Sequence, residues 1–160
     1  MSQTVKCNSV KIRSINCLNK AVARLKAKGK QVELVENTTA RMWGDKVVFG
    51  RFVLKLHGRF DVALEEKTDA QGKYYVPAFD DWNGEVHKQL GTEIAGIHHG
   101  STHVESKGKF TAEELILSNI AGFMTEYSTE AILEEAGFGE YLIESETVEN
   151  KLVCITLNTD

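Results

Sequence analysis

Hydrophobic residues that recur every three or four positions predict two amphipathic helices. The first occupies residues 14–29, where Ser14 is a good N-cap and Gly29 a good C-terminal stop. Its apolar face consists of Ile15, Leu18, Val22 and Leu25. Thr111 and Glu114 form a capping box that starts the second helix, which continues to Gly137. We expect this second helix to be broken or kinked at Ser128-Thr129, where two poor helix formers follow each other.

Alternating apolar and polar residues predict β-strands between and after these helices. Gly44-Asp45 and residues 69–72 are typical turn sequences that separate neighbouring strands. The predicted strands are residues 5–12, 31–35, 39–43, 47–56, 60–64, 74–79, 141–145 and 152–157. This order predicts an α+β fold, an antiparallel sheet with two main amphipathic helices on one face, ferredoxin-like or a variant of it.

Length and composition indicate one domain that spans residues 1–160. Its 42% hydrophobic and 26% charged residues are ordinary for a globular protein. Residues 84–109 are rich in glycine and lack a clear period, so we expect a long loop there, with one helical turn around residues 85–90. The three cysteines form no C-x-x-C pair, which excludes a recognisable disulfide framework or zinc knuckle. No signal peptide or membrane-spanning segment is recognisable, so we expect a cytoplasmic protein without a membrane partner.

Charge is distributed unevenly along the chain. The net charge is only -4, yet 13 of the 19 Lys and Arg residues lie in residues 1–60 and 20 of the 23 Asp and Glu residues lie after them. Such polarity steers an anionic partner to one side of the fold if the two halves form separate surfaces. The alternative is that the halves interleave in space and neutralise each other.

Several short segments resemble those of a known family. They are Val10-Lys11-Ile12, the helix residues Leu18, Ala21 and Leu25, Trp43-Gly44, residues 59–64 and Asp80-Asp81-Trp82, followed by residues 117–138. This pattern is similar to the hypothetical chloroplast frame thirty-five family, a domain of unknown function in plastids, cyanobacteria and phages. The resemblance implies a compact αβ domain and no catalytic residues. It also implies a location in the stroma if the protein is plastid-encoded, or in the host cytoplasm if it is phage-encoded. Residues 92–108 look like an insertion relative to that family.

One face of the predicted sheet combines aromatic and cationic side chains. Phe49, Arg51, Val53 and Lys55 alternate along one strand and would share the face opposite the core, with Arg41 and Trp43 on the neighbouring strand. We expect a non-enzymatic binding or adaptor domain that acts through this uncovered face and the loop after Gly84, and that self-associates as a homo-oligomer. The alternative is a binder of nucleic acid or of an anionic nucleotide-like ligand, because RNA-binding sheets stack bases on aromatics and hold phosphates with cations. Its expected contacts are Arg24, Arg41, Arg51, Lys55 and Arg59.

Histidines in the predicted loop suggest a third hypothesis. His98, His99 and His103 are the densest group of potential metal ligands, and they would serve a metal-dependent hydrolase. Their spacing fits no standard zinc pattern, and His99-Gly100-Ser101 lacks the second half of a two-histidine phosphoesterase motif. The carboxylates Asp80 and Asp81 are better explained as turn formers. We therefore expect no catalytic residues and no cofactor.

Overall fold

A five-stranded antiparallel sheet forms the centre of the computed structural model, which describes residues 4–99, 104–106, 108–136, 141–149 and 152–159. The strand order is β1-β5-β4-β3-β2, so β1 and β2 lie at opposite edges. Because every neighbouring pair is antiparallel, these two edge strands run in the same direction. The strands are β1 (Thr4–Lys6), β2 (Val32–Arg41), β3 (Val47–Leu56), β4 (Val62–Asp69) and β5 (Gly72–Asp80).

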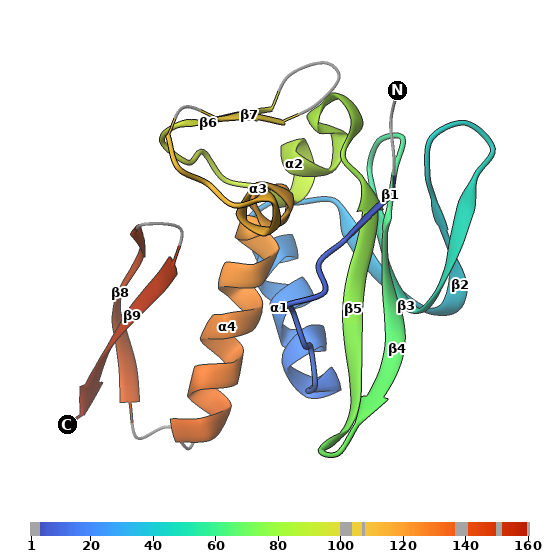
Figure 1. The fold of residues 1–160 in the computed structure, drawn as a ribbon. Helices are drawn as coiled ribbons and strands as arrows, with labels where there is room; N and C mark the ends of the chain where they lie inside the picture. The colour runs from blue at the N-terminus through green and yellow to red at the C-terminus, as the bar shows by residue number, and fades with distance from the viewer. Residues whose placement is uncertain (1–3, 100–103, 107, 137–140, 150–151, 160) are drawn as a thin grey trace.

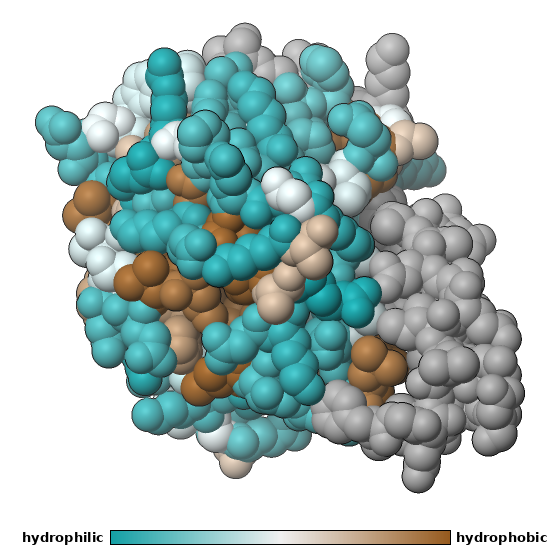
Figure 2. All heavy atoms as spheres, turned by 180° about the vertical axis from the view of Figure 1, so that it is seen from behind, coloured by the Kyte–Doolittle hydropathy of each residue, from teal (hydrophilic) through white to brown (hydrophobic). Residues whose placement is uncertain are grey.

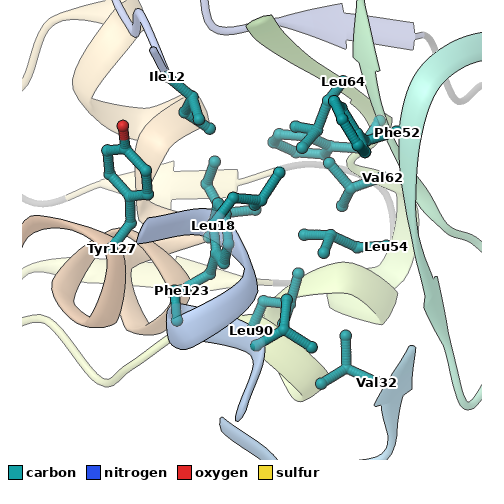
Figure 3. Packing of buried hydrophobic residues seen from close by; sticks show 14 of the residues in the cluster. Ile12, Leu18, Val32, Phe52, Leu54, Val62, Leu64, Leu90, Phe123 and Tyr127 are labelled. Atoms are coloured by element: carbon teal, nitrogen blue, oxygen red, sulfur yellow. The ribbon is translucent and has the colours of Figure 1, made fainter. Parts of the chain in front are cut away.

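The two long helices lie together on one face of this sheet (Figure 1). They are α1 (Ile15–Ala27), which connects β1 to β2, and α4 (Ala121–Ala136). The face of the sheet beneath them and their own apolar sides form the main core, part of which Figure 3 shows. Its largest fully buried side chains include Ile12, Leu18, Phe52, Leu54, Leu64, Phe79 and Phe123. The predicted α+β fold with both main helices on one face is therefore confirmed.

Polar groups fix the start of α1 against α4. Ser14 caps the helix by accepting a hydrogen bond from the backbone N–H of Cys17, as the sequence predicted. The hydroxyl of Tyr127 accepts hydrogen bonds from the backbone N–H groups of Arg13 and Ser14, at 3.1 Å each. Tyr127 thus satisfies donors just before the helix, and the approach of the chain to α1 is fixed by α4.

The second predicted helix is divided at a position other than the one expected. The Thr111–Glu114 capping box is present and starts α3 (Ala112–Ser118), while α4 continues through Thr129 without interruption. The division falls after Ser118, where the backbone N–H groups of Asn119 and Ile120 bond to carbonyls three residues back instead of four. The Ser118 hydroxyl donates to the carbonyl of Leu115 at 2.6 Å, and the Asn119 amide donates to the same carbonyl at 3.3 Å. The break predicted at Ser128-Thr129 is wrong.

Residues 84–109 are not one long loop. They contain α2 (Glu85–Leu90), which follows a short 3₁₀ turn at Trp82–Gly84, and the strand pair β6 (Ile97–His99) and β7 (Val104–Ser106). The helical turn expected at residues 85–90 is present as α2, and buried Val86 and Leu90 anchor it in the main core. A second separate pair, β8 (Tyr141–Glu149) and β9 (Leu152–Thr159), follows α4 and confirms the two closing strands.

The face of the sheet opposite the helices is covered in its centre by the chain itself. Asn37 adopts a φ of 51°, and the pairing of β2 with β3 is interrupted between Asn37 and Arg51. Beyond this point the β2–β3 hairpin turns away from the helices and stands beside β4 and β5 (Figure 1). Its Ala40 and Met42 form a second buried cluster with Val53, Ala63 and Ala78. The expectation of an uncovered sheet face is therefore wrong at its centre, because periodicity does not reveal where a hairpin bends.

None of the described helices combines the length and the apolar character needed to cross a lipid bilayer.

Candidate binding surface

Asp61, at the start of β4, holds the far half of the hairpin against the sheet. Its carboxylate is fully buried and accepts hydrogen bonds from the backbone N–H groups of Arg41 and Leu56 and from the Arg41 guanidinium, at 2.9–3.0 Å. Burial alone raises the pKa of Asp61, but the bonds from Arg41 and Leu56 outweigh it and hold that pKa below its ordinary value. The group is therefore a structural anion that is ionised at neutral pH.

A second buried carboxylate joins the hairpin turn to the end of β5. Asp80 accepts the backbone N–H of Trp43 at 3.3 Å and that of Trp82 at 2.9 Å. The two indole rings lie with their centroids 4.6 Å apart, and buried Phe60 meets Trp82 edge-on at 6.2 Å. Asp80 thus sets the backbone positions from which an aromatic pair is displayed.

The outer side of the hairpin is unusually apolar. Of the large hydrophobic side chains that are exposed in the described part of the chain, all but Ile15 lie on β2, β3 or the turn between them. Phe49 is 60% exposed, Val47 53% and Trp43 46%. Seen from behind, hydrophobic residues gather in a band on the half of the molecule that carries this hairpin (Figure 2).

Arg59 extends this apolar region with one cation. Its guanidinium carbon lies 5.3 Å from the centroid of the Trp82 ring, within cation–π distance. Trp82 contacts Trp43 in the hairpin turn, and Val47 and Phe49 follow Trp43 along β3. We name Trp43, Val47, Phe49, Arg59 and Trp82 together the hairpin surface. It combines aromatic rings, one aliphatic side chain and an arginine, contributed by the hairpin, by the segment after β3 and by the 3₁₀ turn after β5.

The structure does not assemble the predicted cation set into one site. Each of four members contacts carboxylates of the chain itself: Arg24 with Glu126 and Glu130, Arg41 and Lys55 with Asp61, and Arg51 with Glu36. Arg24 lies on α1, on the helical side of the sheet, whereas the other three belong to the hairpin. Of the predicted ligand-binding residues, Trp43, Phe49 and Arg59 belong to the hairpin surface, and the other four form these ion pairs.

The predicted histidine group is not assembled either. His98 and His99 are neighbours in β6 and so project to opposite faces, His98 being exposed and His99 half-buried. His103 lies outside the described residues. The partner of His99 is instead His87 of α2, whose ring stacks on it with centroids 3.5 Å apart. Within the described ranges, no three His, Cys, Asp or Glu side chains converge as metal ligands.

His99 also contacts a serine, in an arrangement unlike a nucleophile and its base. Its Nε2 lies 2.9 Å from Oγ of buried Ser118. The single hydroxyl proton of Ser118 is donated to the carbonyl of Leu115, so the hydroxyl accepts from the Nε2–H of His99. Burial, followed by the nearby His87 and His98, lowers the pKa of His99 to about 4. His99 is thus a neutral hydrogen-bond donor and does not act as a base toward Ser118.

Sequence reasoning missed three residues that organise this part of the fold. Trp82 stands in one of the segments that carry the family resemblance, but the sequence pattern indicates no role for its side chain. The neighbouring Asp80 is confirmed as a turn former, because it accepts the backbone N–H of Trp82 two residues further on. For Asp61 the available signal was an acidic residue inside a strongly apolar strand pattern, which indicates a buried and paired carboxylate. His87, the third, lies in a segment without clear periodicity.

Comparison with models of protein families, with curated proteins and with solved structures finds no match for this chain.

Proposed function

We propose that this protein is a non-enzymatic binding module that uses the hairpin surface to bind a second copy of itself. The observation that supports this most directly is the concentration of exposed apolar residues on one hairpin, beside a tryptophan pair and an arginine. Tryptophan and arginine are enriched among the residues that dominate the energy of protein interfaces. An exposed apolar group of this kind is typical of an interaction site.

The rigidity of the surface favours tight association. Asp61 fixes Arg41 near the end of β2 and Asp80 fixes the turn residue Trp43, so the turn end of the hairpin is attached to the sheet. A surface that is already ordered loses little conformational entropy on binding. Association through it therefore retains more of the free energy gained from apolar burial.

The position of β2 favours a second copy as the partner. β2 is an edge strand, so one row of its backbone N–H and C=O groups faces away from the sheet. Two identical edge strands pair antiparallel across a two-fold axis, which is self-complementary. Val35, which is 39% exposed, lies on this edge strand and adds exposed apolar area to it.

The mass of the protein in solution tests this proposal. We expect a dimer by light scattering coupled to size exclusion and by native mass spectrometry. The double variant Val47→Thr, Phe49→Ser is expected to be monomeric, because it removes the two most exposed apolar side chains of the hairpin surface. Ile15→Ser is the matched control, since Ile15 is 40% exposed but lies on α1. A monomeric natural chain, or dissociation caused equally by the control, contradicts the proposal.

Nucleic-acid binding is the alternative proposal, and Arg59 beside Trp82 is the observation that favours it. Stacking on Trp82 and one phosphate contact from Arg59 predict weak binding with a shallow dependence on salt. Fluorescence anisotropy with a labelled single-stranded oligonucleotide tests this: Arg59→Glu is expected to remove binding, and Lys73→Glu, at the far end of β5, to leave it unchanged. Binding that survives Arg59→Glu contradicts this alternative.

A further inference from the structure

A pocket of about 260 Å³ lies on the other side of the sheet from the hairpin surface, among α1, α2 and α4. Leu25 of α1 and Leu90 of α2 supply much of its apolar lining, and Thr125 of α4 lies opposite. Gly122 brings α4 close to the end of α2, since a Cβ added there would lie 2.8 Å from the carbonyl oxygen of Leu90. The pocket exceeds the roughly 150 Å³ of a cavity that holds one benzene molecule.

The charges around this pocket leave one cation without a counterpart. Lys28 and Arg24 contact Glu126, whose side chain is almost fully buried, and Arg24 also lies 3.7 Å from Glu130. Lys30 lines the pocket as well, and no carboxylate in the described part of the chain pairs with it. The mouth of the pocket therefore carries an excess of one positive charge.

One residue that lines the pocket has a polar atom without a partner. The Oγ1 of Thr92 is buried and makes no hydrogen bond. A buried hydroxyl without a partner is costly, and such groups in folded proteins are usually satisfied by a bound molecule or by the protein. Thr92 thus marks a place where a ligand atom is expected to accept or donate a hydrogen bond.

We propose that this pocket binds a small monocarboxylate with a hydrocarbon body about the size of a phenyl group. The hydrocarbon body lies between Leu25 and Leu90, and the carboxylate lies at the mouth near Lys30 and the hydroxyl of Thr92. One negative charge suffices, because Lys28 is already paired with Glu126. The site is independent of the hairpin surface, so its test does not depend on whether the chain self-associates.

Titration of the ¹⁵N-labelled protein with 3-phenylpropionate, followed by amide chemical shifts, tests the site. We expect the largest shift changes at Gly91, Thr92 and Gly122, and much weaker binding of the neutral 3-phenylpropan-1-ol. Lys30→Met is expected to weaken binding about three-fold, the size of one exposed ion pair. Lys26→Met removes an equivalent lysine that faces Glu33 instead of the pocket, and it is expected to leave binding unchanged.

A variant that fills the pocket completes the experiment. Thr125→Phe places a ring in the proposed ligand position and is expected to abolish the shift changes, while the dispersion of the amide spectrum shows whether it is folded. If that variant does not fold, Gln89→Trp blocks the same pocket from its mouth. The proposal is overturned if 3-phenylpropionate causes no shift changes, or if the changes centre on the hairpin surface. It is also overturned if the alcohol binds as well as the acid or if Lys30→Met and Lys26→Met have the same effect. Binding by a folded pocket-filling variant would overturn it too.

Discussion

Replacing Asp61 with alanine tests whether a buried carboxylate holds the β2–β3 hairpin in its bent position. Alanine removes the acceptor for the backbone N–H groups of Leu56 and Arg41 and for the Arg41 guanidinium. Nothing else within the described residues is positioned to replace that acceptor. We expect the far half of the hairpin to detach from β4 while the helical side of the sheet stays folded longer.

The expected loss of unfolding free energy follows from the groups left behind. Two buried N–H donors without acceptors cost on the order of 1–3 kcal/mol each. Arg41 contributes less, because its side chain is 47% exposed and regains water when the carboxylate is removed. Partial entry of water into the space lowers the total, so we expect Asp61→Ala to cost about 3 kcal/mol and Asp61→Asn, which keeps one acceptor, about half of that.

Urea unfolding followed by tryptophan fluorescence measures this loss, because Trp43 and Trp82 both report on the hairpin end of the molecule. Asp45→Ala is the matched control: it removes an exposed carboxylate from the turn of the same hairpin, and we expect its effect to stay within about 0.5 kcal/mol. An Asp61→Ala protein as stable as this control would refute the reasoning.

The same variants predict a dependence on pH. The pKa of Asp61 is lower in the folded protein than its ordinary 3.8, so the stabilising effect of the charge is complete above the unfolded pKa. It decreases as the pH falls through 3.8 and then through the folded pKa. The stability difference between the natural chain and Asp61→Asn is thus expected to be constant from neutral pH down to about pH 5 and to shrink below it.

Two further predictions concern other parts of the fold. Gly50→Ala is expected to destabilise the protein by about 1–3 kcal/mol in urea unfolding, because the added Cβ would lie 2.4 Å from the backbone oxygen of Phe52. Thr39→Ala on the neighbouring strand is the control. An equal effect of the two substitutions would contradict the steric argument. The imidazole of His99 is expected to titrate in NMR spectra with a midpoint about 4, since burial, His87 and His98 all lower its pKa. The neutral His99 ring then makes its full contribution to the free energy of unfolding above pH 6.5, and this contribution decreases as the pH falls toward 4. A titration midpoint near 6.5 would contradict the burial of His99.

Local signals in the sequence predicted the secondary structure well. The cap at Ser14 and the capping box at Thr111 and Glu114 are confirmed because each depends on residues within one helical turn. The turn at Gly44 is confirmed by its φ of 65°, a conformation that glycine adopts readily. Features set by residues three or four positions apart are those that pattern analysis captures.

Features that depend on distant residues were not predictable. The bend of the hairpin requires Ala40 and Met42 to meet Ala63 and Ala78, and nothing in the alternation of β2 and β3 specifies that contact. For the same reason Arg41 looked like a ligand-binding cation, although its partner Asp61 lies twenty residues further along the chain. Strand alternation places Phe49 and Val53 on the same uncovered face, but only Phe49 is exposed, because the bent hairpin covers Val53.

The ion pairs between α1 and α4 have a consequence for how the chain folds. Arg24 and Glu126 are separated by 102 positions, and Lys6 and Lys11 meet Glu65 and Asp69 across 59 and 58 positions. The cationic first third of the chain therefore meets its balancing carboxylates only as later segments become available. During synthesis, Arg24 and Lys28 remain without their carboxylate partner Glu126 until α4 has been made. Refolding from denaturant should accordingly be slow for a protein of this size and accelerate at moderate salt, where the repulsion within that stretch is screened.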